Sequence, residues 1–275
     1  MLAVEPLTPI AAHDTSHDTS LDTSLDTSLD HATLAAIAKG APEFLSRAPY
    51  PWASLTGVIR EQAFAELCAS LPPVDMLTCE IGKARGHGQQ SHDRYALQYG
   101  PAVAPRLSPA WRAFVDELHR EPYTSFVRTM WGLGPRERFE LSMHWHYAPS
   151  RASVSPHTDA RRKIGSHIFY FNTPDNWDPA WGGQTLVLDD GGKLDAHDSP
   201  EFGALPQVAA STILGNKSFV FKRTEHSWHA VAPIASPAGR LRKVFIVVVN
   251  RVNLQVMWRR VRGKDPDGYP LRPVI

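Results

Sequence analysis

The sequence has few cysteines and no long apolar run. Cys68 and Cys79 are its two cysteines, too few for a disulfide framework or for a zinc site built on cysteine. No eighteen consecutive residues are apolar, so the sequence offers no candidate for a transmembrane helix. The first residues also lack a basic segment followed by an apolar core. We therefore expect no secretion signal, and a cytoplasmic protein without membrane contact.

A charge excess of either sign is missing as well. Lys and Arg number 29 and Asp and Glu number 28, so the formal net charge at pH 7 is +1. Such a chain has no overall field to attract a polyanion, and we expect no nucleic-acid partner. The hydrophobic share of 43% is ordinary for a globular protein, and 275 residues are enough to bury a sizeable core.

The N-terminal part of the chain contains a low-complexity repeat. Residues 13–30 read HDTSHDTSLDTSLDTSLD, a unit of four residues. Aspartate, threonine and serine compete with helical hydrogen bonds and bury little apolar surface. We therefore expect residues 1–31 to be a disordered tail, although leucines spaced four apart would allow a transient helix.

Residues 32–134 have the pattern of a helical support region. Residues 31–39 predict a helix that ends at Gly40, and residues 55–71 carry apolar side chains at helical spacing before a Pro-Pro pair. One or two more helices are expected after Ser108, because this residue is a suitable N-cap and a proline follows it.

The pattern changes to short strands after Gly134. The runs FELSMHWHYAP, HIFYFNTP, GGQTLVLDD, KSFVFKR and RKVFIVVVNRV are rich in β-branched and aromatic residues, with Pro, Gly, Asn and Asp between them. Several short strands of this kind indicate a sandwich or barrel. We expect a mainly β domain with N-terminal helices (α+β) over residues 135–258 and a C-terminal tail over residues 259–275.

The segment SPHTDARR contains two candidate metal ligands. His157 and Asp159 are two residues apart, so in extended backbone both side chains leave the same face. A third ligand is available in KSFVFKRTEHSWHAVAPI, from His226 or His229. Two histidines and one carboxylate can form a facial triad, which leaves half of an octahedral Fe(II) open for substrate and oxygen.

An arginine at the start of the last strand fits a dicarboxylate cosubstrate. Arg242 shares a strand face with Val244, Ile246 and Val248 by the period of two. A cation on this apolar face is costly unless it meets an anion, and Arg binds carboxylates in a two-pronged fashion. Arg240 shares the face but lies nearer the loop.

The order of these motifs resembles the iron(II)/2-oxoglutarate dioxygenases, in particular their prolyl-4-hydroxylase-like branch. HTD, GGQTLVL, SWHAV and an Arg-led apolar strand occur in the family's order over residues 139–250. The resemblance implies a double-stranded β-helix, which is a jelly-roll or cupin-like barrel buttressed by helices. It implies that Fe(II) is bound by three residues that form the catalytic centre, namely His157, Asp159 and His229.

The resemblance also implies a binding site for 2-oxoglutarate. Arg242 would pair with the distal carboxylate, and Tyr170 and Tyr147 would contact the cosubstrate. Gly182 and Gly183 match a glycine pair that lets a strand turn over the site. The gap between His229 and the arginine is longer than usual in the family, so the choice between Arg242 and Arg240 stays open.

The activity implied by the resemblance is hydroxylation of an unactivated C–H bond in an amino acid, a peptide or a specialised metabolite. Fe(II), 2-oxoglutarate and O2 would take part, with succinate and CO2 released. In the halogenases of this superfamily a small residue replaces the carboxylate, so Asp159 favours hydroxylation. Desaturation or cyclisation, a zinc hydrolase and a non-catalytic cupin-like binding module are alternatives.

The expected partner is thus a small molecule or a peptidyl substrate. We expect His144 and His146 to be structural or to line the substrate site, and the long segment over residues 193–211 could form a lid. The oligomeric state is not fixed by the sequence, and the helical region would allow a dimer.

Overall fold

The computed structural model describes residues 27–83, 90–252 and 254–264. Most of the expected tail, residues 1–26, lies outside the described residues. Where the description begins, Leu29 is fully buried and its backbone N–H donates to the Glu117 carboxylate at 3.2 Å. The chain is therefore already packed against α4 (Pro109–Leu118) two residues before its first helix.

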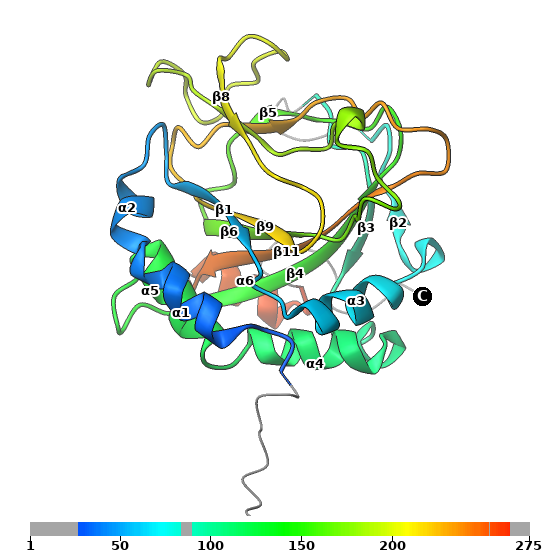
Figure 1. Ribbon diagram of the computed structural model, residues 1–275. Helices are drawn as coiled ribbons and strands as arrows, with labels where there is room; N and C mark the ends of the chain where they lie inside the picture. The colour runs from blue at the N-terminus through cyan, green and yellow to red at the C-terminus, as the bar shows by residue number, and fades with distance from the viewer. Residues whose placement is uncertain (1–26, 84–89, 253, 265–275) are drawn as a thin grey trace, which may run out of the picture.

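Two antiparallel sheets face each other in the described part of the chain (Figure 1). The larger sheet has, in spatial order, β1 (Trp52–Thr56), β9 (Lys217–Lys222), β6 (Lys163–Tyr170), β11 (Arg242–Arg251), β4 (Phe139–Ala148), β3 (Tyr95–Gln98) and β2 (Thr78–Cys79). The smaller sheet has β5 (Val154–His157), β10 (His229–Val231), β7 (Leu186–Leu188) and β8 (Gln207–Ala210). The expected double-stranded β-helix is confirmed.

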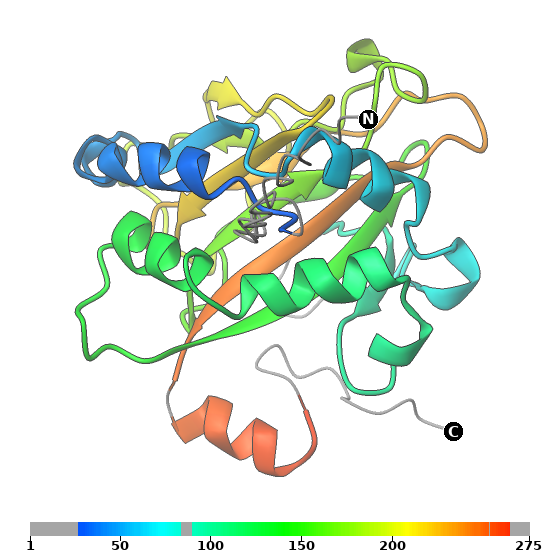
Figure 2. The ribbon, with the colours of Figure 1, turned by 60° about the horizontal axis from the view of Figure 1, so that its bottom comes forward.

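Helices cover the outer face of the larger sheet (Figures 1 and 2). They are α1 (His31–Lys39), α2 (Ala41–Ser46), α3 (Glu61–Ala69), α4 (Pro109–Leu118) and α5 (Tyr123–Trp131). Aromatic rings join the two layers: the ring centroid of Trp111 in α4 lies 5.1 Å from those of Trp145 and Phe245 in the sheet. The short 3-10 helices are η2 (Val74–Met76), η3 (Ala104–Arg106) and η4 (Pro179–Trp181).

The period of two divides the larger sheet between this helical layer and the interior of the barrel. On β11, Phe245, Val247 and Val249 belong to the core under the helices, whereas Arg242 and Ile246 line the cavity between the sheets. This alternation is the one expected from the sequence. It places a buried arginine inside the barrel.

Two helix boundaries follow the capping signals in the sequence. Gly40 ends α1, with its backbone N–H bonded to the Ile37 carbonyl, and the Ser108 hydroxyl accepts from the backbone N–H of Trp111 at the start of α4. The prediction of a helix from residue 55 was wrong about where the helix starts. Residues 52–56 pair with β9 as a strand, Gly57 turns the chain at φ 69°, and α3 begins only at Glu61.

The ends of the expected β domain also differ from the sequence pattern. Strands β1, β2 and β3 join the sheet from the helical region, so residues before 134 contribute to the barrel wall. After β11 the chain forms α6 (Leu254–Val261), on which Leu254 and Trp258 are 81% and 62% exposed. Within the described residues, no helix is both long enough and apolar enough to cross a bilayer.

Candidate metal centre

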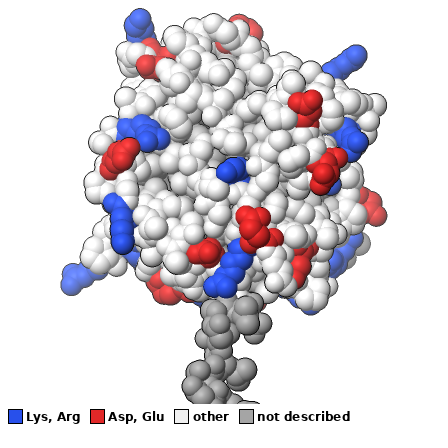
Figure 3. Space-filling view, in the orientation of Figure 1, with Lys and Arg blue, Asp and Glu red and all other residues white. Residues whose placement is uncertain are grey.

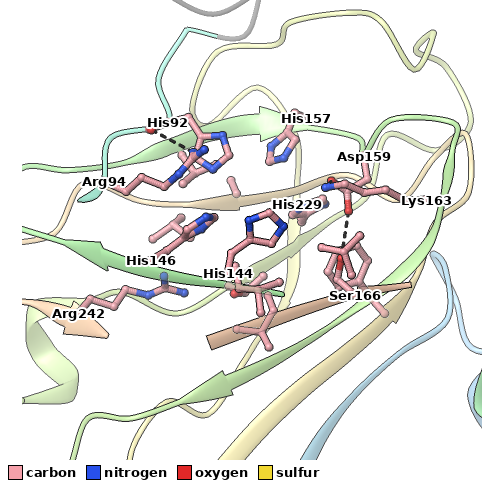
Figure 4. Close-up of a pocket in the computed structure, with 18 of the residues that line it drawn as sticks. His92, Arg94, His144, His146, His157, Asp159, Lys163, Ser166, His229 and Arg242 are labelled. Carbon is pink, nitrogen blue, oxygen red and sulfur yellow. Dashed lines mark hydrogen bonds and ion pairs between the residues drawn. The ribbon is translucent and has the colours of Figure 1, made fainter. Parts of the chain in front are cut away.

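The structure brings together the three expected metal ligands. His157 ends β5 and pairs in register with His229, the first residue of β10. Asp159 lies two residues after His157, just beyond the end of β5. One ligand atom from each residue lies within 4.8 Å of the other two (Figure 4). This grouping depends on the pairing of two strands that are more than 70 residues apart in the chain.

Hydrogen bonds orient both imidazole rings. Nδ1 of His157 is 2.9 Å from the Ser155 carbonyl oxygen, and Nδ1 of His229 is 2.9 Å from the Ser227 carbonyl oxygen. A carbonyl only accepts, so each Nδ1 carries the proton and each Nε2 keeps its lone pair for a metal. Burial lowers the pKa of His157 to about 3, with a further contribution from His229. The ring is therefore neutral at pH 7, as a ligand must be.

Asp159 is held as a carboxylate by its neighbours. Its Oδ1 accepts from the Lys163 ammonium at 2.7 Å, and its Oδ2 lies 3.4 Å from the Ser166 hydroxyl. Burial alone would raise the pKa of this carboxyl, but the charge of Lys163 and its hydrogen bond act against burial, and the pKa is lowered. The three residues therefore offer two neutral nitrogens and one anionic oxygen, the donor set of a facial Fe(II) site.

The triad opens into a cavity of about 260 Å³ between the two sheets. His144 and His146 of β4 line this inner cavity, as expected for substrate-lining residues, together with Ser166, Ile168 and Ile246. Burial, helped by the charge of nearby Arg94, lowers the pKa of His146 well below its usual value. The cavity wall therefore combines many polar and charged side chains with a smaller set of apolar ones.

Arg242 lies in the same cavity and is 7% exposed. Its Nε donates to the Gly183 carbonyl, and its guanidinium lies 5.6 Å from the centroid of the Tyr170 ring. Burial lowers the pKa of this guanidinium, because its charge is largely removed from solvent. Among the described residues no carboxylate pairs with it, so the cavity wall presents a buried cation suited to an anionic ligand.

One glycine of the pair, Gly183, is explained by its contact with this arginine. Gly183 has φ 93°, and a Cβ at this position would come within 3.0 Å of the Arg242 Cδ. Only glycine combines this backbone conformation with such a close approach. Arg240, in contrast, is exposed in the turn before β11, so of these two arginines it is Arg242 that lies inside the barrel.

Of the two expected cosubstrate tyrosines, one lies beside Arg242 and the other lies away from the metal ligands. Tyr170 is buried beside Arg242, with its hydroxyl 2.8 Å from Thr185 Oγ1. Tyr147 points to the opposite face of β4 and donates to the Pro72 carbonyl at 2.9 Å, so the structure does not bring it to the triad. His226 is 2.9 Å from the Asp190 carboxylate and lies outside the group of metal ligands.

The sequence pattern missed two cavity residues, His92 and Arg94. Both lie just before β3, in a stretch for which no element was expected. Arg94 is 4% exposed and forms an ion pair with Glu80 at 2.9 Å, and the His92 ring lies 5.9 Å from that of His157. Ser166 was also missed, although the period of two on β6 could have identified it.

No family model matches the chain, and no curated protein matches it significantly. Solved structures match its fold. A prolyl-4-hydroxylase from Pseudomonas putida is 18% identical with a TM-score of 0.51, over 80% of this chain and 100% of that chain. A prolyl hydroxylase from Trichoplax adhaerens, solved with a hypoxia-inducible-factor peptide, is 10% identical with a TM-score of 0.55, over 80% and 91%.

A third structure is an oxidoreductase of the 2-oxoglutarate/Fe(II) oxygenase family from Burkholderia pseudomallei. It is 16% identical with a TM-score of 0.50, over 82% of this chain and 94% of that chain. At sequence identities this low, the structural likeness establishes the fold alone. The chain therefore has the double-stranded β-helix fold of these prolyl hydroxylases and 2-oxoglutarate/Fe(II) oxygenases, and its His-Asp-His group is consistent with a facial iron-binding triad.

Proposed function

We propose that the protein is an Fe(II)- and 2-oxoglutarate-dependent dioxygenase that hydroxylates an unactivated C–H bond of an amino acid, a peptide or a specialised metabolite. One observation carries the proposal: a triad of two histidines and one aspartate shares a cavity with the buried cation Arg242. A zinc hydrolase or a simple metal-binding module would give Arg242 no role.

The residues divide the work between metal and cosubstrate. His157, Asp159 and His229 would hold Fe(II), which with 2-oxoglutarate and O2 supplies the oxidising chemistry that converts C–H to C–OH and releases succinate and CO2. Arg242 would bind the distal carboxylate of 2-oxoglutarate, since a buried guanidinium without an acidic partner gains most from a carboxylate. Tyr170, packed against Arg242, would hold that side chain in place.

The barrel walls have a role of their own in this proposal. Apolar side chains from both sheets, among them Ile246 of β11 and Val231 of β10, line the inner cavity beside the polar ones. Because Arg242 is only 7% exposed there, its attraction to a carboxylate is screened less than at the surface. The protein would therefore supply orientation and a sheltered cation, while the cofactors supply the reactivity.

The test is an anaerobic titration of the Fe(II)-loaded protein with 2-oxoglutarate, followed through the visible metal-to-ligand charge-transfer band. The wild type should show the band. Arg242→Ala should need at least ~30-fold more 2-oxoglutarate, because loss of a buried charge partner costs at least about 2 kcal/mol. Arg240→Ala is the matched control on the exposed turn and should titrate like the wild type.

Other outcomes would contradict the proposal. Absence of the band in wild type with iron bound would instead favour the binding module. Equal behaviour of the two arginine variants would remove Arg242 from the cosubstrate site. Once a substrate is found, succinate release together with a product that gained one oxygen atom would distinguish hydroxylation from desaturation and cyclisation.

A further inference from the structure

A second hollow of about 380 Å³ opens outside the triad, and we call it the outer chamber. Residues 157–163 and residues 196–199 form most of its wall, with His92 and Arg223. Several residues line both the outer chamber and the inner cavity, namely His92, His157, Asp159, Arg162 and Lys163. A molecule in the outer chamber would therefore lie against two of the triad residues, His157 and Asp159.

Two residues of the outer chamber wall, Asp159 and Lys163, lie across the triad histidines from Arg242. In Figure 4, Arg242 and His146 are on one side of the triad histidines, and Asp159 and Lys163 are on the other. Arg242 does not line the outer chamber. An anion bound in the chamber would thus be separate from the cosubstrate carboxylate at Arg242.

The wall of the outer chamber carries more positive than negative side chains. The cations are Arg161, Arg162, Lys163 and Arg223, and the carboxylates are Asp159 and Asp198. Glu225 offsets part of this charge, since it pairs with Arg223 at 2.7 Å and lies 3.6 Å from Arg161. Asp198 accepts from the backbone N–H of Asp195 within its own loop. The surplus of positive charge therefore lies beside the triad.

This charge is a local feature of the chamber. The chain as a whole has a formal net charge of +1, and positive and negative side chains are interspersed on the face seen in Figure 3. The two halves of the chamber wall are also joined, because the Thr158 hydroxyl donates to the Ala196 carbonyl at 2.9 Å. A wall with more cations than carboxylates is suited to binding an anion.

Lys163 links the chamber to the metal centre. Its ammonium bonds to Oδ1 of Asp159 at 2.7 Å, and its side chain is 18% exposed. A divalent cation held by Asp159 would share this carboxylate with the Lys163 ammonium, and the two cations would repel each other. The lysine side chain is flexible and its charge is compact, so it can turn from Asp159 into the outer chamber.

We propose that the outer chamber binds an anionic group of the substrate, a carboxylate or a phosphate, and that Lys163 turns from Asp159 to this group when the metal binds. The inference deepens the proposed function and rests on it for the role of Asp159 as a metal ligand. It restricts the substrate to molecules that carry such an anion within reach of the oxidised carbon.

The test measures the binding of inorganic phosphate by calorimetry at constant ionic strength. Mn(II) replaces Fe(II), and the protein is compared metal-free, with Mn(II), and with Mn(II) plus 2-oxoglutarate. We expect Mn(II) to raise the phosphate affinity of the wild type at least several-fold, because it releases Lys163. Lys163→Gln should lose this gain, while Arg120→Gln, an exposed control far from the chamber in sequence, should keep it.

Two controls separate this effect from other causes. Direct binding of phosphate to Mn(II) would survive in Lys163→Gln, and that result would overturn the proposal. The metal affinity of Lys163→Gln is measured separately so that every variant is saturated with Mn(II). Acetate in place of phosphate identifies the preferred anion: binding of either supports the proposal, and binding of neither overturns it.

The outcome is independent of the cosubstrate chemistry. If 2-oxoglutarate fails to bind, the proposed function fails, but the comparison of metal-free and Mn(II)-loaded protein still reports on Lys163. If the charge-transfer band forms normally and phosphate affinity does not respond to metal or to Lys163→Gln, the proposed function stands and the anion site is rejected.

Discussion

His157 and His229 face each other across β5 and β10, with ring centroids 4.3 Å apart, and each donates Nδ1–H to the carbonyl two residues earlier. The same local bond on both strands turns both Nε2 atoms toward Asp159. Because backbone carbonyls fix the rings before any metal arrives, little ordering is needed on binding. Metal affinity should therefore depend mainly on the charge and position of the third ligand.

Replacing Asp159 by asparagine should weaken divalent metal binding by ~100-fold or more. The variant keeps the shape of the side chain but removes the anionic donor, and loss of an outer partner alone already costs 10–100-fold. It also leaves Lys163 beside the site without its acidic partner. Competition with a chelating dye measures the affinity for Mn(II). Asp175→Asn, on an exposed loop, is the matched control and should bind like the wild type.

Replacing Gly183 by alanine should impair the cosubstrate site more than the fold. A Cβ at this position meets the Arg242 side chain at 3.0 Å and requires φ 93°, so Arg242 must shift and the backbone is strained. We expect a loss of about 1–3 kcal/mol in the free energy of unfolding, together with weaker binding of 2-oxoglutarate. Urea unfolding and the charge-transfer titration measure the two effects.

Gly192→Ala is the control for strain alone. Gly192 has φ 72°, and a Cβ there would meet nothing within 4 Å. This variant should lose stability but retain the wild-type titration with 2-oxoglutarate. Equal losses of cosubstrate affinity in both variants would show that the contact between Gly183 and Arg242 does not matter.

The parts of the site that follow from local periodicity could be predicted from the sequence. His157 and Asp159 share a face because they lie two apart in extended backbone, and Arg242 lies inside the barrel because it alternates with Phe245 and Val247. These relations need only the period of a strand. The order of the motifs along the chain then identified the fold, which the solved structures confirm.

The parts that depend on long-range pairing could not be predicted. His92 and Arg94 reach the cavity because the chain before β3 bridges to Val154, which no local pattern reveals. Tyr147 shows the opposite problem. The family resemblance implied that it is a site residue, yet on β4 it alternates with His144 and His146 and therefore faces the helices.

The two tyrosines should respond differently to loss of the hydroxyl group. Tyr170→Phe removes bonds to Thr185 and Ser211 beside Arg242, so 2-oxoglutarate affinity should fall by about 10-fold, equivalent to one hydrogen bond. Tyr147→Phe removes the bond to Pro72 and should lower stability by about 1 kcal/mol without changing that affinity. A weaker cosubstrate titration in Tyr147→Phe would restore the role that the resemblance implies for Tyr147.

His167 should make the fold sensitive to acid. It is fully buried on the helical side of β6, where its ring nitrogens bond to Tyr123 and Ser218. Burial lowers the pKa of His167 from 6.5 to about 3. The unfolded chain therefore binds a proton below pH 6.5 that the folded chain refuses, so the stability contributed at neutral pH is lost progressively as the pH falls from about 6.5 toward 3.

Between pH 7 and pH 5 this single group should lower the free energy of unfolding by roughly 2 kcal/mol, at about 1.4 kcal/mol per pH unit below the unfolded pKa. Other buried histidines add to the total, so the variant His167→Gln is needed to isolate the effect. Between pH 7 and pH 5, His167→Gln should lose less unfolding free energy than the wild type, and the difference should equal the contribution of His167 given above. Urea unfolding at the two pH values measures both losses. His119→Gln, at the exposed end of α4, should leave the loss unchanged. Identical losses in the wild type and His167→Gln would mean that His167 takes up its proton within the folded protein, and its bonds to Tyr123 and Ser218 would then have to accommodate a charged ring.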